Sequence, residues 1–481
     1  MASTDDKLHV VMLPWLAFGH FLPFLELSKL IARKGHRISF LSTPRNIDRL
    51  PKPPAELSHL ITFVKLPLPP VENLPEDAEA TTDLPYGKIK YLKKAYDELQ
   101  RPVAAFLQDA APDWVIFDFA PFWLGPIAAK LGISSAFFSI YLASSVCFMN
   151  PIPGTAEDCR TTPEDFTVPP KSAPFKSTVA FRLFEVKRIF DDVSGEDDLV
   201  PVRYRVGAGI EGCDLVVLRS CYEFESEWIT FLGQIHSKPV IPVGLLPPPV
   251  PMGDDGKDKG WQTIKHWLDT KPPGSVVYVA FGTEAKLSQP ELAELALGLE
   301  LSELPFFWVL NSQGGGVSEL PEGFEERTKG RGVVWRSWAP QMKILSHDSV
   351  GGFLCHSGWS SVVEAVQLGK PLVLLTGLSD TGLVARVLEE KKMAYSVPRD
   401  ERDGWFTRDS VADSLRLVMV AGGGQIFKDK VQEMKRLFGD RVLQDQYVDN
   451  LLAHFKAHTR RASGSGRSTL HINEKTKKNP T

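Results

Sequence analysis

The stretch LHVVMLPWLAFGHFLPFLELSKLIARKGHRISFLS, residues 8–42, decides the fold because its hydrophobic period changes twice. Residues 8–13 are predicted to form a short apolar strand, and HFLPFLELSKLIARKG (20–35) has the spacing of a helix that ends on glycine. HRISFLS (36–42) is predicted to be a second strand. A strand, a helix and a strand in this order predict a βαβ unit with parallel strands.

The same alternation continues along the rest of the chain. Further apolar strands are predicted at ITFVKL (61–66), DWVIFD (113–118), SSAFFSI (134–140), CDLVVLRS (213–220), SVVYVAFG (275–282), PFFWVL (305–310), GVVWRSW (332–338), VGGFLCH (350–356) and PLVLLTG (371–377). Such a series is typical of parallel sheets that are covered by helices on both faces. The predicted fold class is therefore α/β, with two Rossmann-like, doubly wound domains.

A Pro- and Gly-rich stretch divides the series. Its composition, PVIPVGLLPPPVPMGDDGKDKGW (239–261), is that of an exposed linker. We predict one domain over residues 1–240, a linker over 241–261 and a second domain over 262–444. The length of 481 residues agrees, since one core rarely serves more than about 200 residues. Ligands are expected in the cleft between the carboxyl ends of the two sheets.

Composition excludes several classes of function. With 55 Lys and Arg against 59 Asp and Glu, the chain lacks the broad cationic surface that nucleic acid requires. Five cysteines without a C-x-x-C pair indicate free thiols in the cytosol, not a disulfide framework or a zinc site. The start, MASTDDKLHV, has no signal-peptide pattern, and the uncharged residues 131–156 favour a strand and a loop over a membrane span. We expect a cytoplasmic monomer without stable membrane insertion.

The end of the chain differs in composition from the rest. Residues 459–481 are basic, rich in Gly and Ser and nearly free of large apolar side chains, which is typical of a disordered tail. Weak attachment to an anionic membrane surface is the alternative.

One match to a known pattern is rejected. GAGIEG (207–212) fits the dinucleotide fingerprint G-x-G-x-x-G, which works only between a strand and a following helix. Here the strand at 213–220 follows the glycines. We therefore expect no dinucleotide there.

The hexapeptide HSGWSS (356–361) is the first candidate site. It lies between an apolar strand and a helix predicted to begin near residue 359. Free N–H groups, small hydroxyl side chains and a glycine that allows close approach suit a diphosphate, and His356 and Ser361 offer further donors. The alternative is an ordinary helix start, because serine is a common N-cap.

Neighbouring residues favour the diphosphate. The Trp338 indole can stack on a nucleobase, and Glu364, one turn into the helix, can accept hydrogen bonds from ribose hydroxyls. Asp380 follows a strand, where a carboxylate can bind the hydroxyls of a sugar.

His20 and Asp118 are the second candidate site, because each stands at the carboxyl end of a predicted strand. A helix N-terminus disfavours the imidazolium form of His20, which keeps a neutral base available near pH 7. Asp118 can stabilise the cation that forms when His20 takes a proton. The alternative is a purely structural histidine and an ordinary aspartate at a strand end.

Residues 338–381 resemble the donor-binding box of plant family-1 UDP-dependent glycosyltransferases, from W-A-P-Q through H-x-G-W, S-x-x-E and G-x-P to the final acidic residue. The resemblance extends over residues 7–458. It is strongest to the branch that lengthens sugars on flavonoid and terpenoid glycosides, including steviol glycosides. It implies the two-domain GT-B arrangement, with the acceptor in the N-terminal domain, the UDP-sugar in the C-terminal domain and residues 445–458 returning across the cleft.

The resemblance also implies roles for single residues. It places Trp338 on uracil, the Ala339 backbone at the uracil edge, and Gln341 and Glu364 on the ribose. It implies that the diphosphate is bound by His356, Trp359, Ser360 and Ser361. It also implies that the rest of the UDP-sugar site is formed by Trp359, Asp380, Thr381 and Thr283. His20 becomes the base and Asp118 its partner, in the P-W/F-x-x-x-G-H context.

Four positions depart from the family pattern. Ser357 replaces Cys, Ser360 replaces Asn, Thr376 replaces Pro, and Thr381 stands where the family usually has Gln. Ser360 keeps a small polar donor, whereas Thr381 loses an amide that can hold sugar hydroxyls. Donor preference therefore depends most on Thr381.

Together with these observations, the resemblance implies an inverting glycosyltransferase that needs no metal or other cofactor. UDP-glucose is the expected donor, and the sugar of a small apolar terpenoid or flavonoid glycoside is the expected acceptor. An apolar acceptor requires an apolar lining, for which we predict Trp15, Phe18, Phe119, Phe122 and Trp123, although core packing is their alternative role.

Two other functions remain open. Thr381 favours UDP-rhamnose or UDP-xylose as an alternative donor. The four departures together are also compatible with a non-catalytic protein that binds UDP or terpenoids.

Overall fold

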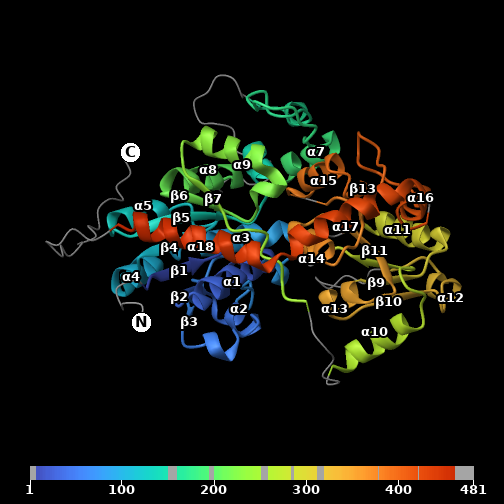
Figure 1. Cartoon of the computed structure of the whole chain (residues 1–481), viewed down its shortest axis with the longest axis horizontal. Coiled ribbons are helices and arrows are strands. Elements are labelled where there is room, and N and C mark those ends of the chain that lie inside the picture. Colours follow the sequence, from blue (N-terminus) through green and yellow to red (C-terminus); the bar gives the residue numbers. More distant parts are fainter. Residues whose placement is uncertain are drawn as a thin grey trace.

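The computed structural model describes residues 7–149, 160–193, 200–250, 258–282, 287–310, 319–377, 379–420 and 422–460. Figure 1 shows two α/β bodies side by side, the first coloured blue to green and the second yellow to red. The strand order is β3-β2-β1-β4-β5-β6-β7 in the first sheet and β10-β9-β8-β11-β12-β13 in the second. All pairings between the described strands are parallel. The predicted fold is therefore confirmed.

The strands fall on the predicted apolar runs because parallel strands covered on both faces need side chains that are apolar throughout. The first sheet consists of β1 (His9–Leu13), β2 (Arg37–Ser42), β3 (Ile61–Lys65), β4 (Trp114–Phe117), β5 (Ser134–Ser139), β6 (Leu215–Leu218) and β7 (Val240–Pro242). The second consists of β8 (Val276–Ala280), β9 (Phe306–Val309), β10 (Gly332–Trp335), β11 (Val350–Cys355), β12 (Leu372–Leu374) and β13 (Ala394–Ser396). The strands β7 and β13 have no counterpart among the predicted runs, because they are three-residue edge strands too short to give a hydrophobic period.

Helices connect the strands and cover both sheets. The first body carries α1 (Phe18–Arg33), α2 (Pro44–Arg49), α3 (Ile89–Asp97), α4 (Gln100–Ala110), α5 (Leu124–Lys130), α6 (Ala143–Met149), α7 (Leu183–Val193), α8 (Val202–Gly212) and α9 (Tyr222–His236). The second carries α10 (Lys259–Asp269), α11 (Gln289–Ser302), α12 (Phe324–Arg327), α13 (Gln341–Ser346), α14 (Trp359–Gln367), α15 (Thr381–Glu390), α16 (Arg408–Met419) and α17 (Gln425–Gly439), followed by α18 (Arg441–His458).

The glycines of residues 207–212 serve helix packing. They lie inside α8, which precedes β6, so the strand and helix order needed for a dinucleotide is absent there. A Cβ on Gly209 would lie 2.9 Å from the Phe137 ring, and one on Gly125 would lie 2.4 Å from the Gly212 carbonyl oxygen. Small residues thus let α8 approach both β5 and α5 closely.

The predicted linker of residues 241–261 overlaps regular structure at both ends. Pro242 ends β7, where an edge strand tolerates a missing N–H group. The second body begins with α10 at Lys259, because Asp258 caps that helix by accepting a hydrogen bond from the Trp261 N–H at 3.0 Å. Residues 251–257 of the linker, and the tail beyond Arg460, lie outside the described residues.

Helix α18 crosses back from the second body to the first, as Figure 1 shows in red. It contacts α1 and β7. Its Phe455 ring stacks on the Trp114 ring of β4 with centroids 4.1 Å apart, and the Trp114 indole N–H points to the Phe455 carbonyl oxygen and the Thr459 hydroxyl. This helix begins at Arg441, four residues before the predicted start at 445.

We expect Phe455→Ala to destabilise the first body by about 3–5 kcal/mol, because a buried aromatic ring is lost and its stacking partner is left beside a cavity. Urea unfolding followed by tryptophan fluorescence measures this change. Gln446→Ala, on the exposed side of the same helix, is the matched control and is expected to change stability by less than about 0.5 kcal/mol. Equal effects of both changes would contradict the predicted anchoring.

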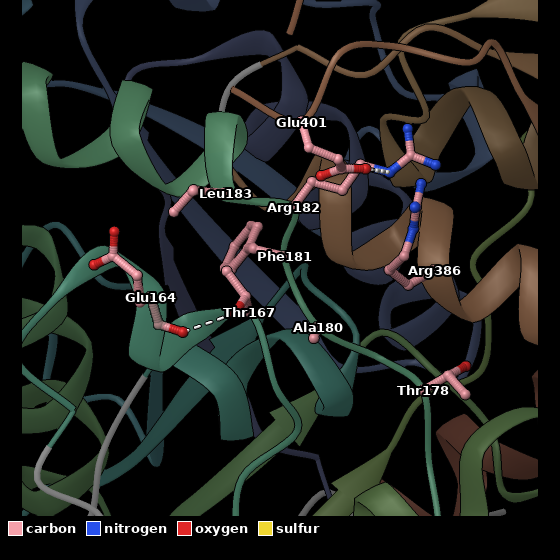
Figure 2. Close-up of a pocket in the computed structure, with 9 residues that line it drawn as sticks. All are labelled: Glu164, Thr167, Thr178, Ala180, Phe181, Arg182, Leu183, Arg386 and Glu401. Carbon is pink, nitrogen blue, oxygen red and sulfur yellow. Dashed lines mark hydrogen bonds and ion pairs between the residues drawn. The ribbon is translucent and has the colours of Figure 1, made fainter. Parts of the chain in front are cut away.

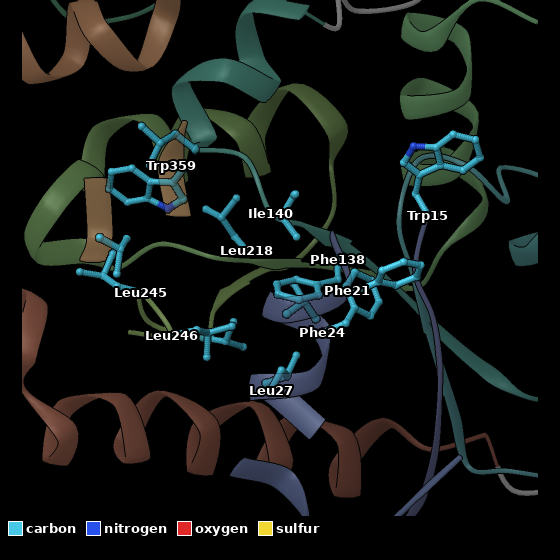
Figure 3. Close-up of a cluster of buried hydrophobic side chains, with 14 of the residues drawn as sticks. Trp15, Phe21, Phe24, Leu27, Phe138, Ile140, Leu218, Leu245, Leu246 and Trp359 are labelled. Carbon is cyan, nitrogen blue, oxygen red and sulfur yellow. The ribbon is translucent and has the colours of Figure 1, made fainter. Parts of the chain in front are cut away.

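One apolar cluster joins the two bodies. Figure 3 shows Phe21, Phe24 and Leu27 of α1 beside Phe138 of β5, with Leu218 between this group and the Trp359 indole of the second body. The Trp359 ring lies 5.3 Å from the Phe224 ring of α9 and 5.9 Å from the Phe438 ring of α17. The two sheets are thus held together by buried side chains as well as by α18.

Candidate active site

The carboxyl ends of both sheets meet between the two bodies. In each sheet the strand order reverses at one point, between β1 and β4 in the first and between β8 and β11 in the second. Crevices for ligands form at such points because the helices on either side of them lie on opposite faces of the sheet. His20 and Asp118 follow β1 and β4, and Gly282 and His356 follow β8 and β11.

His20 and Asp118 form a buried pair. The His20 Nδ1 atom lies 2.7 Å from Asp118 Oδ2, and the two residues are only 6% and 2% exposed. The same carboxylate accepts hydrogen bonds from the backbone N–H groups of Trp15 at 2.7 Å and Ala120 at 3.0 Å. With Asp118 fixed in this way, a hydrogen on His20 Nδ1 leaves Nε2 as the basic nitrogen.

Tyr141 faces that basic nitrogen, and the sequence analysis did not identify it. Its hydroxyl lies 3.3 Å from His20 Nε2, and its ring meets the imidazole edge to face at 5.8 Å. Tyr141 follows β5, so the signal that singled out Asp118, a polar residue after a strand, was also available here.

His356 sits against glycines of two loops. A Cβ on Gly358 would lie 2.4 Å from His356 Nε2, and a Cβ on Gly282 would lie 3.0 Å from its Cε1. Burial lowers the pKa of His356 to about 4, so the ring is neutral at pH 7. Its Nδ1 atom is buried without a hydrogen-bond partner in the described part of the chain. The ring is a neutral donor or acceptor rather than a cation.

The predicted nucleoside residues lie together at the start of α13 and α14. The Trp338 side chain is 75% exposed, and its carbonyl oxygen accepts a hydrogen bond from the Trp335 indole at 3.1 Å. Ala339, beside it, is half-buried. Gln341 Nε2 donates to Glu364 Oε2 at 2.7 Å and contacts Ser361 Oγ at 3.4 Å. An exposed indole thus stands next to a preorganised set of polar groups.

Two of the four departures from the family pattern stabilise one loop. The Ser357 hydroxyl lies 2.6 Å from the Thr381 carbonyl oxygen, and Ser357 has a left-handed backbone conformation with φ of 65°. Thr381 is 6% exposed, and its hydroxyl accepts a hydrogen bond from the Gly377 N–H at 3.1 Å. The Thr381 hydroxyl therefore points into its own loop.

A third departure from the family pattern, Thr376, forms a contact between the two bodies. The Thr376 hydroxyl donates to Glu185 Oε1 of α7 at 2.7 Å, and Glu185 is 3% exposed. A Cβ on Gly382 would lie 2.3 Å from the other carboxylate oxygen. Proline at position 376 has no hydroxyl, so the family's usual residue could not make this bond.

Asp380 lies close enough to His20 for their charges to interact. Burial raises the pKa of Asp380 to about 6, while a bond to its own backbone and the His20 charge oppose the rise. This carboxyl group is thus positioned at the His20 edge of the second body and changes charge in the mildly acidic range.

We expect Asp380→Asn to become more stable than the parent as the pH rises. Below the unfolded-state pKa of 3.8 both proteins carry a neutral group at this position, whereas above a folded-state pKa of about 6 only the parent buries a charge. The difference in unfolding free energy should grow to about 3 kcal/mol in favour of Asn between pH 4 and 6 and then level off. Denaturant unfolding at several pH values measures it. A difference independent of pH would contradict the raised pKa.

Trp359 and Ser360 contact the first body. The Trp359 indole donates to the Arg219 carbonyl oxygen at 3.1 Å, and Trp359 is 5% exposed. The Ser360 hydroxyl accepts a hydrogen bond from Arg219 Nη1 at 2.7 Å. Both side chains were expected at the diphosphate, and Arg219 was not among the predicted site residues, although it follows β6 as Asp118 follows β4.

The five predicted lining residues lie in three separate places. The Phe119 ring lies 5.5 Å from the His20 ring and 6.0 Å from the Trp15 ring, so Phe119 adjoins the base and Trp15 adjoins Phe119. Phe18, which is half-buried, packs edge to face on the Phe21 ring at 5.7 Å. Two more aromatics lie beyond β4, with the Phe122 ring 6.0 Å from Tyr204 and the Trp123 indole nitrogen buried without a partner in the described structure.

A separate hollow of about 360 Å³ opens where the two bodies meet, near α7 and α15. Figure 2 shows Arg182 and Glu401 paired at its edge, with Arg386 pointing toward them. None of the predicted site residues lines it.

Thr283 lies outside the described residues. In the described ranges no cluster of three or more His, Cys, Asp or Glu side chains has a metal-binding arrangement. Four cysteines, Cys147, Cys213, Cys221 and Cys355, are buried free thiols. Among the described helices none is long and apolar enough to cross a membrane.

Comparison with known proteins points to a single family. The sequence model of the family described as UDP-glucoronosyl and UDP-glucosyl transferase matches residues 258–448. UDP-glycosyltransferase 91A1 of Arabidopsis thaliana is 55% identical, over 93% of this chain and 96% of its own length. Soyasaponin III rhamnosyltransferase of Glycine max is 44% identical, over 94% of this chain and 96% of its own length.

The fold has solved counterparts. The crystal structure of Os79 from O. sativa in complex with U2F and trichothecene superimposes with a TM-score of 0.75. It covers 93% of this chain and all of the Os79 chain, with 22% sequence identity. This likeness is evidence for the two-domain architecture.

Proposed function

The chain belongs to the plant family-1 UDP-glycosyltransferases, in the branch numbered 91, and from this premise we propose which sugar it transfers, to what and by which residues. It is a UDP-sugar-dependent glycosyltransferase. The proposed reaction moves glucose from UDP-glucose to a hydroxyl on the sugar of a small apolar terpenoid or flavonoid glycoside. The observation that carries the proposal is the buried pair of His20 and Asp118, which lies within charge-interaction range of Asp380.

We propose His20 as the general base. Its Nε2 atom takes the proton of the acceptor hydroxyl, and the acceptor oxygen forms a bond to the anomeric carbon as the bond from that carbon to the diphosphate breaks. Asp118 stabilises the resulting imidazolium through the 2.7 Å bond to Nδ1. A single displacement of this kind inverts the anomeric carbon, so UDP-α-glucose is expected to give a β-glucoside.

The donor roles follow the arrangement of the second body. We assign uracil stacking to Trp338 and the uracil edge to the Ala339 backbone. We assign the ribose hydroxyls to Gln341 and Glu364, whose side chains are hydrogen-bonded to each other. Ser361, His356 and the first turn of α14 would hold the diphosphate, without a metal ion, as family-1 transferases do. Asp380, on the His20 side, would hold the transferred sugar.

The acceptor would bind in the first body, against Trp15 and Phe119. The Phe119 ring adjoins His20 and the Trp15 ring adjoins Phe119, and an apolar aglycone gains affinity from contact with such rings. The soybean relative supports a glycosylated acceptor, because its name gives soyasaponin III and saponins are glycosides. We propose the cytosol as the site of the reaction, since the four buried free thiols need reducing conditions to persist.

UDP-rhamnose is the second candidate donor, and UDP-xylose the third. The soybean relative is by name a rhamnosyltransferase, and the Thr381 hydroxyl is bonded within its own loop instead of reaching outward. A glutamine at this position would add an amide able to bind the hydroxyls of glucose, including the 6-hydroxyl that rhamnose and xylose lack.

The test offers UDP-glucose, UDP-rhamnose and UDP-xylose separately, each with a pooled set of flavonoid and diterpenoid glycosides. We expect release of UDP together with a product heavier by one hexose, and none from His20→Ala. We also expect Thr381→Gln to shift the ratio of kcat/KM values toward UDP-glucose by about 10-fold, the worth of one added hydrogen bond. Turnover with UDP-rhamnose alone would reassign the donor, and an α-linked product would exclude the single displacement.

A further inference from the structure

Arg219 extends from the first body into the diphosphate loop of the second. It follows β6, where its backbone N–H donates to the Ser139 carbonyl oxygen at 2.9 Å, and the residue is 3% exposed. The guanidinium Nη1 donates to the Ser360 hydroxyl at 2.7 Å, and Nε donates to the Leu245 carbonyl oxygen at 3.0 Å. Its own carbonyl oxygen accepts the Trp359 indole N–H. Both ends of Arg219 are therefore fixed against the first turn of α14.

The charge on Arg219 is not balanced by a direct ion pair. Within the described ranges, both acceptors of its guanidinium are neutral, a hydroxyl and a carbonyl oxygen. Glu364 and Glu26 favour its charged form from a distance, and burial lowers its pKa only to about 10, so it stays protonated at pH 7. A buried cation with only neutral partners is costly unless an anion binds beside it.

The diphosphate subsite needs such a cation. His356 is neutral at pH 7, and a helix N-terminus supplies only about half a positive charge. The diphosphate of a UDP-sugar carries two negative charges, and a further charge develops on UDP as it leaves. Ser360, which the guanidinium holds, lies in the first turn of α14, where free backbone N–H groups are available to an anion.

We propose that Arg219 is a binding residue of the diphosphate subsite, with its planar guanidinium donating to phosphate oxygens of the UDP-sugar while Ser360 fixes its position. The inference rests on the proposed function, which places the diphosphate at α14. Arginine suits this role because it has five N–H donors, of which the hydrogen bonds to Ser360 and Leu245 use two, and its fork matches phosphate geometry.

With Arg219, the diphosphate subsite is formed by residues of both bodies. Arg219 lies outside residues 258–448, which the family's sequence model matches, and it comes from the sheet that carries His20 and Asp118. The cation that neutralises the leaving group is then fixed to the same rigid sheet as the base. The relative position of the two groups is set by that one sheet, and both reach the UDP-sugar when the two bodies are in contact.

The test compares UDP with uridine, which lacks the diphosphate, by calorimetric titration of the full chain. We expect Arg219→Met to weaken UDP binding by about 10–100-fold, the worth of a charge-assisted hydrogen bond, and to leave uridine binding unchanged. Arg219→Lys keeps the charge without the fork and should lie between the parent and Arg219→Met. Arg182→Met, which breaks the contact with Glu401 between the bodies, is the matched control and should bind both ligands as the parent does.

Three results would overturn the inference. They are an unchanged UDP affinity in Arg219→Met, an equal loss of UDP and uridine affinity, and a loss in Arg219→Lys as large as that in Arg219→Met. The second would assign Arg219 to packing alone, and the third would show that its positive charge is not what binds the diphosphate. Failure of the proposed function is distinguishable, because a parent protein that binds UDP but releases none from any UDP-sugar lacks the transferase activity and leaves the Arg219 inference intact, whereas one that binds neither UDP nor uridine lacks the nucleotide site. Thermal melting of each variant shows whether it folds. If Arg219→Met does not fold, the affinities of Arg219→Lys for UDP and uridine provide the test.

Discussion

Replacing His20 with alanine is expected to lower kcat by about 10²–10⁴-fold and to leave UDP binding unchanged. The imidazole is the only group in direct contact with Asp118 that can take a proton from an acceptor, among the residues the structure describes. It makes no hydrogen bond to α13 or α14 in that part of the chain, so the loss should fall on turnover. Initial rates of UDP release and calorimetric titration with UDP separate the two quantities.

Asp118→Asn tests the pairing at nearly constant volume. An amide in place of the carboxylate can present its N–H to His20 Nδ1, which would put the ring hydrogen on Nε2 and remove the base. We expect a loss of up to about 10⁴-fold in kcat, comparable with that of His20→Ala. His59→Ala, an exposed histidine of the same body, is the matched control and should keep full activity. More than a tenth of the parental turnover in His20→Ala would exclude the base role.

Replacing His356 with alanine is expected to cost about 10²–10³-fold in kcat, the worth of one preorganised donor to a developing negative charge. The ring is neutral at pH 7, because burial lowers its pKa to about 4, so the contribution is that of a hydrogen bond and should not depend on pH between 6 and 8. Initial rates across this pH range measure both the loss and its constancy.

Gly358→Ala is the companion variant. Its new Cβ would lie 2.4 Å from His356 Nε2 and would push the ring out of place without removing it. We expect a loss of the same order as in His356→Ala, about 10²-fold or more. His266→Ala, on the exposed side of α10, should have no effect. A parental turnover rate in His356→Ala would show that His356 does not stabilise the leaving diphosphate, and that α14 and Arg219 are sufficient for it.

Much of the fold could be predicted because its signals are local. Eleven predicted apolar runs correspond to β1–β6 and β8–β12, since strands buried on both faces cannot tolerate charged residues at their centres. The missed strands, β7 and β13, are three residues long and form sheet edges, where pairing with a neighbour decides the conformation. The start of α10 was missed for a similar reason, because the cap at Asp258 lies within a Pro- and Gly-rich stretch.

The candidate site was predictable in part. His20, Asp118 and the residues of α14 carry signals in the sequence, a polar residue after an apolar strand and small residues before a helix. The sequence contains no signal for the directions in which these side chains point. Ser360 and Trp359 bind Arg219, and the Thr381 hydroxyl closes its own loop, because packing between the two bodies offers these groups nearer partners.

The sequence by itself determined the two parallel sheets, the polar groups at their carboxyl ends and the family. Only the tertiary structure decided that Arg219 meets Ser360 and that Glu185 meets Thr376, across 141 and 191 residues of chain. The physical reason is that hydrophobic periodicity and capping act over a few neighbouring residues. Contacts between two bodies depend instead on the shape and charge of complete surfaces, which exist only once both sheets have folded.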